Sequence, residues 1–85
     1  MILSECQKEI INYILMYYNN PDEIPIPNAK VFHLKFRKRY TKDEINLAIE
    51  NLIENNILLE YSDYNYLDFT DAFRESEYYD EVLKS

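Results

Sequence analysis

Apolar side chains recur at helical spacing near the start of the chain. Ile10, Ile14 and Tyr17 fall on one face of a helix over residues 4–19. Ser4 and Gln7 match a capping box, in which the side chain of each residue accepts a hydrogen bond from the backbone N–H of the other. The pattern predicts a first helix over these residues.

The clearest helical pattern covers residues 41–56. Its apolar positions repeat at intervals of three and four residues and form one stripe: Ile45, Ala48, Ile49 and Leu52. Thr41 and Glu44 form a second capping-box pair. The chain contains no glycine, so Asn56 is expected to end this helix in the left-handed conformation that glycine usually supplies.

The three prolines of the chain exclude a helix from residues 21–28, where Ile24 and Ile26 allow a short extended piece. Residues 28–37 fit two interpretations. A helix capped by Asn28 places Phe32 and Phe36 on one face. A strand instead alternates apolar residues with histidine, lysine and arginine. We favour the helix because of the elements that follow it.

Residues 58–61 and 66–70 are rich in strand-forming residues, with a turn-prone segment between them, and predict a β-hairpin. From Asp71 onward we expect one helix with a single apolar face: Ala72, Phe73, Ser76, Tyr79 and Leu83. The third helix and the hairpin are expected to bury a common set: Ile45, Ile49, Leu52, Leu58, Leu67 and Phe69. The expected fold class is therefore α+β and mostly α, in a single domain of residues 1–85.

Charge is distributed unevenly along the chain. The formal net charge is −7, yet six of the nine basic residues lie within residues 30–42, where there is no acid. The other 72 residues hold 16 acids and three bases, a charge of −13. Such segregation bears on the partners of a protein rather than on its fold.

The order of the expected elements resembles the winged helix-turn-helix family. Residues 41–52 look like the recognition helix of that family. Asn56-Ile57-Leu58 stands where the family usually has Gly-Leu-Ile, and Leu67-Asp68-Phe69-Thr70 is similar to its closing strand. The resemblance implies a winged helix with three helices, a two-stranded wing and a C-terminal helix. It also implies that the third helix enters the major groove and that the wing touches the backbone.

Two functions follow from fold and charge together, because winged helices bind DNA, RNA and proteins alike. The first is a small regulator of transcription that docks its basic segment on nucleic acid through Lys30, Lys35, Arg37, Lys38, Arg39, Tyr40, Thr41, Lys42 and Asn46. The second is an acidic inhibitor of phage or plasmid type, a DNA mimic or anti-defence protein, that binds a host nucleic-acid-binding protein through Glu50, Glu54, Asp63, Tyr64, Phe73 and Tyr79. The second remains open because the expected recognition helix exposes one base, Lys42, against three acids.

The apolar face expected on the C-terminal helix suggests a homodimer, unless that helix folds back on the first one. The first residues lack a signal-peptide pattern, no stretch reaches the about 20 apolar residues of a membrane span, and the single cysteine fits a reducing compartment. We therefore expect a cytoplasmic protein with no membrane partner.

The sequence lacks the residue combinations that a catalytic or metal site needs. His33 and Cys6 are the only histidine and cysteine, too few for the four ligands of a structural zinc site. Neither a serine–histidine nor a cysteine–histidine arrangement has a third member, and the absence of glycine excludes phosphate-cradling glycine loops. We expect no enzyme activity, no cofactor and no metal.

Overall fold

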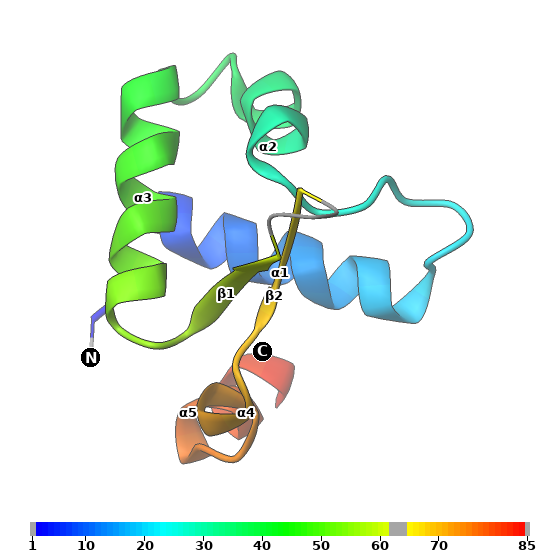
Figure 1. Cartoon of the computed structure of the whole chain (residues 1–85), viewed down its shortest axis with the longest axis vertical. Coiled ribbons are helices and arrows are strands. Elements are labelled where there is room, and N and C mark those ends of the chain that lie inside the picture. The colour runs from blue at the N-terminus through cyan, green and yellow to red at the C-terminus, as the bar shows by residue number, and fades with distance from the viewer. Residues whose placement is uncertain (1, 62–64, 85) are drawn as a thin grey trace.

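The computed structural model describes residues 2–61 and 65–84 (Figure 1). Within them the chain forms helices and one antiparallel hairpin in this order: α1 (Glu5–Asn19), α2 (Ala29–Phe36), α3 (Lys42–Glu54), β1 (Leu58–Tyr61), β2 (Tyr66–Phe69), α4 (Asp71–Arg74) and α5 (Glu77–Lys84). The expected class, a mostly helical α+β chain with a two-stranded hairpin, is confirmed. None of the helices described is long and apolar enough to cross a membrane.

The starts of the first and third helices follow the predicted caps. Ser4 and Gln7 form a capping box at α1, and Thr41 and Glu44 form one at α3. In both boxes the hydroxyl accepts the N–H three residues ahead at 3.1 Å. The first N–H groups of a helix have no partner within the helix, and each capping box satisfies two of them. The boxes therefore fix where the two helices begin.

Residues 28–37 are helical, so the helix interpretation is confirmed and the strand alternative is wrong. The Asn28 side chain caps α2 by accepting from the Val31 N–H at 2.9 Å. Phe32 and Phe36 lie on one face, stacked with ring centroids 6.1 Å apart, and both are buried. A strand cannot bring residues four apart into such contact, whereas one turn of helix does.

Two asparagines take the backbone conformation that glycine usually supplies. Asn56 has φ 60° after α3, as predicted, and Asn65 has φ 47° before β2. The Asn56 carbonyl also accepts from the Thr70 hydroxyl, which ties the end of α3 to the end of the hairpin. The chain therefore makes its sharp turns without glycine.

The hairpin pairs residues 58–61 with 66–69, with Leu58 opposite Phe69 and Tyr61 opposite Tyr66. The predicted common set is confirmed, because all six members are buried: Ile45, Ile49, Leu52, Leu58, Leu67 and Phe69. The connection between α1 and α2 runs along the free side of β2, where the Leu67 N–H donates to the Pro27 carbonyl at 2.9 Å.

The prediction of one C-terminal helix is wrong. The chain makes two short helices, α4 and α5, separated at Glu75 and Ser76. Thr70 caps α4, and the Ser76 hydroxyl accepts from the Tyr79 N–H at 3.2 Å, as a second cap does. A second cap inside the segment ends one helix and starts another, so the expected single face does not form: Ala72 is exposed and Phe73 buried. The Leu83 side chain lies outside the described residues.

The C-terminal segment folds back onto the chain itself. Phe73 is only 4% exposed, and its ring centroid lies 5.0 Å from that of Phe69. Tyr79 is half-buried, with its ring 5.7 Å from Phe69. Of the apolar side chains on which the homodimer prediction was based, Phe73 is thus covered and Tyr79 half-covered within one chain.

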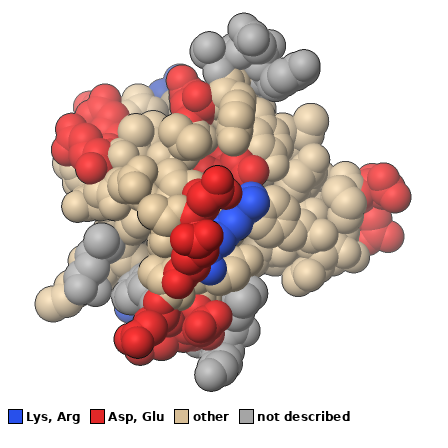
Figure 2. Space-filling view, turned by 60° about the horizontal axis from the view of Figure 1, so that its bottom comes forward, with Lys and Arg blue, Asp and Glu red and all other residues tan. Residues whose placement is uncertain are grey.

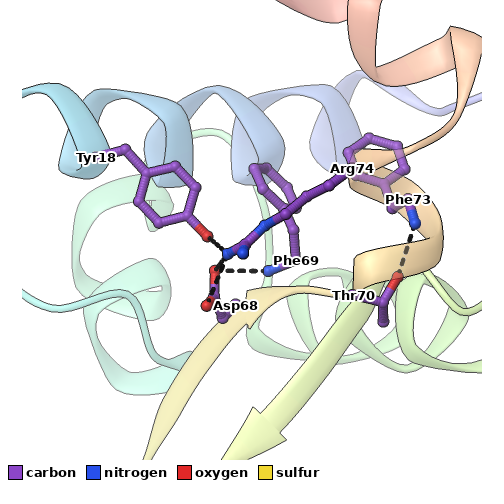
Figure 3. A network of polar contacts seen from close by, with 6 residues as sticks. All are labelled: Tyr18, Asp68, Phe69, Thr70, Phe73 and Arg74. Atoms are coloured by element: carbon purple, nitrogen blue, oxygen red, sulfur yellow. Dashed lines mark hydrogen bonds and ion pairs between the residues drawn. The ribbon is translucent and has the colours of Figure 1, made fainter.

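Polar contacts fasten this segment to the rest of the protein (Figure 3). The Arg74 guanidinium donates to both carboxylate oxygens of Asp68 at 2.9 and 3.0 Å and to the Tyr18 hydroxyl. It also lies over the Tyr18 ring, 5.4 Å from the centroid. Arg74 therefore joins α1, β2 and α4 at one point.

Candidate functional site

The strongest concentration of charge is on α2 and the turn into α3, at the top of Figure 1. We call it the basic surface, and its six cationic side chains are all exposed: Lys30, Lys35, Arg37, Lys38, Arg39 and Lys42. Only Arg39 forms an ion pair within the described part of the chain, with Glu9 of α1. The face around α4 and α5 is different: among its charged side chains, acidic ones cover more of the surface than basic ones (Figure 2).

Two of these cations make cation–π contacts with tyrosine rings of the chain. The Lys35 ammonium lies 5.8 Å from the centroid of the Tyr13 ring, and the Arg39 guanidinium lies 5.5 Å from that of Tyr40. Tyr40 itself packs against the core. Lys35 and Arg39 are thus partly engaged within the chain, whereas Lys30, Arg37, Lys38 and Lys42 are not in any such pair among the described residues.

The polar residues predicted to contact phosphates are also engaged internally. The Thr41 hydroxyl and backbone N–H both belong to the capping box of α3. Asn46 is exposed, but its side-chain oxygen lies 2.7 Å from His33 Nε2, which bridges α3 and α2. Thr41 is therefore engaged within α3, and Asn46 links α3 to α2. The exposed cations are left as the principal phosphate-binding groups.

The outer face of α3 is negative. Asp43, Glu50 and Glu54 are exposed along it, and Leu47 among them is 58% exposed. These exposures agree with the helical pattern of residues 41–56. A groove of a nucleic acid is lined by phosphates, so this face repels it while the neighbouring basic surface attracts it.

The residues predicted for a protein partner do not form one surface. Glu50 and Glu54 are exposed, but Phe73 is buried in the core and so is unavailable to a partner, because α4 packs it against Phe69. Tyr79 is half-buried beside it. Asp63 and Tyr64 lie outside the described residues.

Two apolar grooves border the connection between α1 and α2, and neither was predicted from the sequence. One, of about 390 Å³, has these lining residues: Tyr13, Met16, Ile24, Pro25, Val31, Leu34 and Lys35. The other, of about 350 Å³, is lined by Ile26, Tyr61, Tyr66 and Asp68. Leu34 could have signalled the first, because it lies on the face of α2 opposite Phe32 and Phe36 yet is apolar.

Among the residues that the structure describes, burial perturbs three titratable groups. It raises the pKa of the Cys6 thiol, of the Tyr13 hydroxyl and of the Tyr66 hydroxyl above their ordinary values. The Tyr13 hydroxyl donates to the Pro25 carbonyl at 2.8 Å, a bond that needs its proton. All three groups are thus held neutral near pH 7, and they serve packing rather than proton transfer. Among the described residues, no group of three or more histidine, cysteine, aspartate or glutamate residues could hold a metal ion.

No protein-family model, curated protein or solved structure matches this chain.

Proposed function

We propose that this chain is a winged helix-turn-helix module that docks its basic surface on a nucleic-acid backbone. In this interpretation α2 and α3 form the helix-turn-helix and β1 with β2 forms the wing. The order of the elements, the capped third helix and the hairpin that directly follows it support the assignment.

The observation that carries the proposal is the exposure of the basic surface. Lys30, Arg37, Lys38 and Lys42 are exposed and have no ion pair within the described residues, although the chain has a large surplus of acids. Cations that remain unpaired in an acidic protein are available for an external anion. Each one that neutralises a phosphate releases condensed counterions and strengthens binding.

The acids on α3 determine the mode of docking. Asp43, Glu50 and Glu54 occupy the outer face with which a recognition helix would read bases. The proposed contact therefore uses α2 and the turn after it, against phosphates, and carries no sequence information of its own. A role in transcription would then come from occupying DNA or recruiting a partner.

The proposal is tested by the salt dependence of binding to two duplexes of unrelated sequence, followed by fluorescence anisotropy. With four cations on phosphates, log K against log salt should have a slope of about −3 to −4, equal for both duplexes. No binding at about 50 mM salt, or a slope near zero, would refute it.

A second candidate function has support from the same α3 face. Three exposed carboxylates around the exposed Leu47 suit a basic protein surface with an apolar centre, as an inhibitor of a nucleic-acid-binding protein would need. In that case α3, and not α2, is the contact.

Charge reversal on α3 separates the two candidates. Glu50→Lys with Glu54→Lys should strengthen duplex binding in the proposed function, because two repulsive carboxylates beside the DNA become cations. The matched control is Glu75→Lys with Glu77→Lys, which makes the same change in net charge at two exposed positions beside α4 and α5, at the bottom of Figure 1 and away from the basic surface. Equal gains from both variants would show that only overall charge matters. No duplex binding by any variant would favour the inhibitor.

A further inference from the structure

The larger groove lies between the second half of α1, the connection and α2. Its floor is Tyr13, which is buried and packs edge-on against Phe32 with ring centroids 5.4 Å apart. Met16 and Leu34 line it as well and are 49% and 61% exposed, so two large apolar side chains from different helices face solvent at one groove. Water therefore covers an apolar surface here that a partner could cover instead.

Hydrogen bonds hold the walls of this groove in place. The Tyr13 hydroxyl fixes the Pro25 carbonyl at 2.8 Å, and the Leu67 N–H fixes the Pro27 carbonyl at 2.9 Å. The two prolines further restrict the backbone of the connection. A groove that exists before its ligand arrives loses little ordering entropy on binding.

The charge around the groove is polarised. Lys35 is the one charged residue among its lining residues, and Lys30 is exposed one helical turn before the lining residue Leu34, on the same face of α2. The acids Asp22 and Glu23 are exposed in the turn that leads into Ile24. A ligand in the groove meets cations along α2 and anions at the turn.

We propose that this groove binds an acidic segment of a protein partner, with a large apolar side chain of that segment inserted between Met16 and Leu34. The carboxylates of the bound segment would face Lys35 and Lys30. The acidic turn at residues 22–23 would repel a further carboxylate at the other end of the groove. A nucleic-acid backbone cannot occupy the site in this way, because it has no apolar group to cover Tyr13, Val31 and Leu34. This inference goes beyond backbone docking. Peptide binding and backbone docking are nevertheless connected, because Lys35 belongs both to the groove and to the basic surface. The peptide and the nucleic acid would therefore compete for Lys35.

Selection from a displayed library of random short peptides tests the proposal without a known partner. We expect enriched peptides to carry a large apolar residue flanked by aspartate or glutamate. Leu34→Ser should weaken their binding at least about tenfold, as loss of a central apolar anchor does, and Lys35→Glu should weaken it as well. Leu47→Ser is the matched control, since Leu47 is exposed to a similar degree on α3, and it should leave binding unchanged.

Several outcomes would overturn the proposal: no enrichment, enrichment of basic peptides, or binding that Leu34→Ser leaves intact. A second copy of the chain as occupant would appear as a dimer in light scattering that Leu34→Ser converts to a monomer, and this too would overturn it. Leu34 carries no charge, so Leu34→Ser should retain duplex binding. A variant that loses peptide binding but keeps duplex binding thus tests the groove alone. Absence of duplex binding by the wild-type protein would instead refute the proposed function.

Discussion

Replacing Lys30, Arg37 and Lys38 together with alanine should abolish duplex binding near physiological salt. The three side chains are exposed and form no ion pair in the described structure, so the change removes charge without removing a structural contact. Each lost phosphate contact lowers the salt slope by about 0.9, so the slope should fall by about two to three. At about 0.1 M salt, counterion release alone then corresponds to a loss of roughly several hundred-fold in affinity. Anisotropy titrations of variant and wild type over one salt range measure both quantities.

The choice of residues depends on the ion pair between Arg39 and Glu9. Replacing Arg39 would remove a contact to α1 as well as a charge, and the two effects would be mixed. The matched control is Lys8→Glu with Asn12→Asp, which changes the net charge equally at two exposed positions of α1. The ion pair of Lys8 with Glu5 that it removes is exposed and lies within α1, so its loss has little effect on stability. If this control weakens binding as much as the triple variant does, the basic surface is not the docking site.

Leu52→Ala should lower the free energy of unfolding by about 2–5 kcal/mol. Leu52 is fully buried at the centre of the apolar face of α3. Truncation leaves a cavity because α1 and the hairpin, packed around this face, are held by their own contacts. The loss is a large share of the about 5–15 kcal/mol by which small domains are stable. Urea unfolding followed by circular dichroism measures the change.

Leu47→Ala provides the internal reference for that experiment. It makes the same chemical change on the same helix, but at a side chain that is 58% exposed. Its effect should stay within about 0.5 kcal/mol. Equal effects of the two substitutions would mean that α3 does not pack as described.

Features decided within a few residues could be predicted from the sequence. The caps at Ser4, Asn28 and Thr41 depend on side chains three residues from the N–H groups they satisfy. The helical stripe of α3 and the turn at Asn56 are equally local. The C-terminal break is local too: the helical pattern places Ser76 on the apolar face, whereas its hydroxyl caps a new helix three residues before Tyr79.

Features that depend on tertiary packing could not be predicted in this way. Glu9 and Arg39 are thirty positions apart, and nothing in either neighbourhood indicates their pairing. The contact of Arg74 with Tyr18 spans a still longer separation. The candidate site was therefore predicted as a set of charges, but not which of them are engaged internally. The grooves beside the connection form only once α1, α2 and the hairpin are assembled.

The hydrogen bond between Leu67 and Pro27 has a consequence for aggregation. A two-stranded hairpin exposes two edges, and free edges invite pairing with strands of other molecules. The connection covers one edge of β2, and its prolines have no N–H with which to extend the sheet further. The other edge, β1, is only four residues long and carries the exposed carboxylate of Glu60. The two edges of a hairpin rich in tyrosine and leucine thus offer little length for pairing with strands of other molecules, which disfavours cross-β stacking of the folded chain.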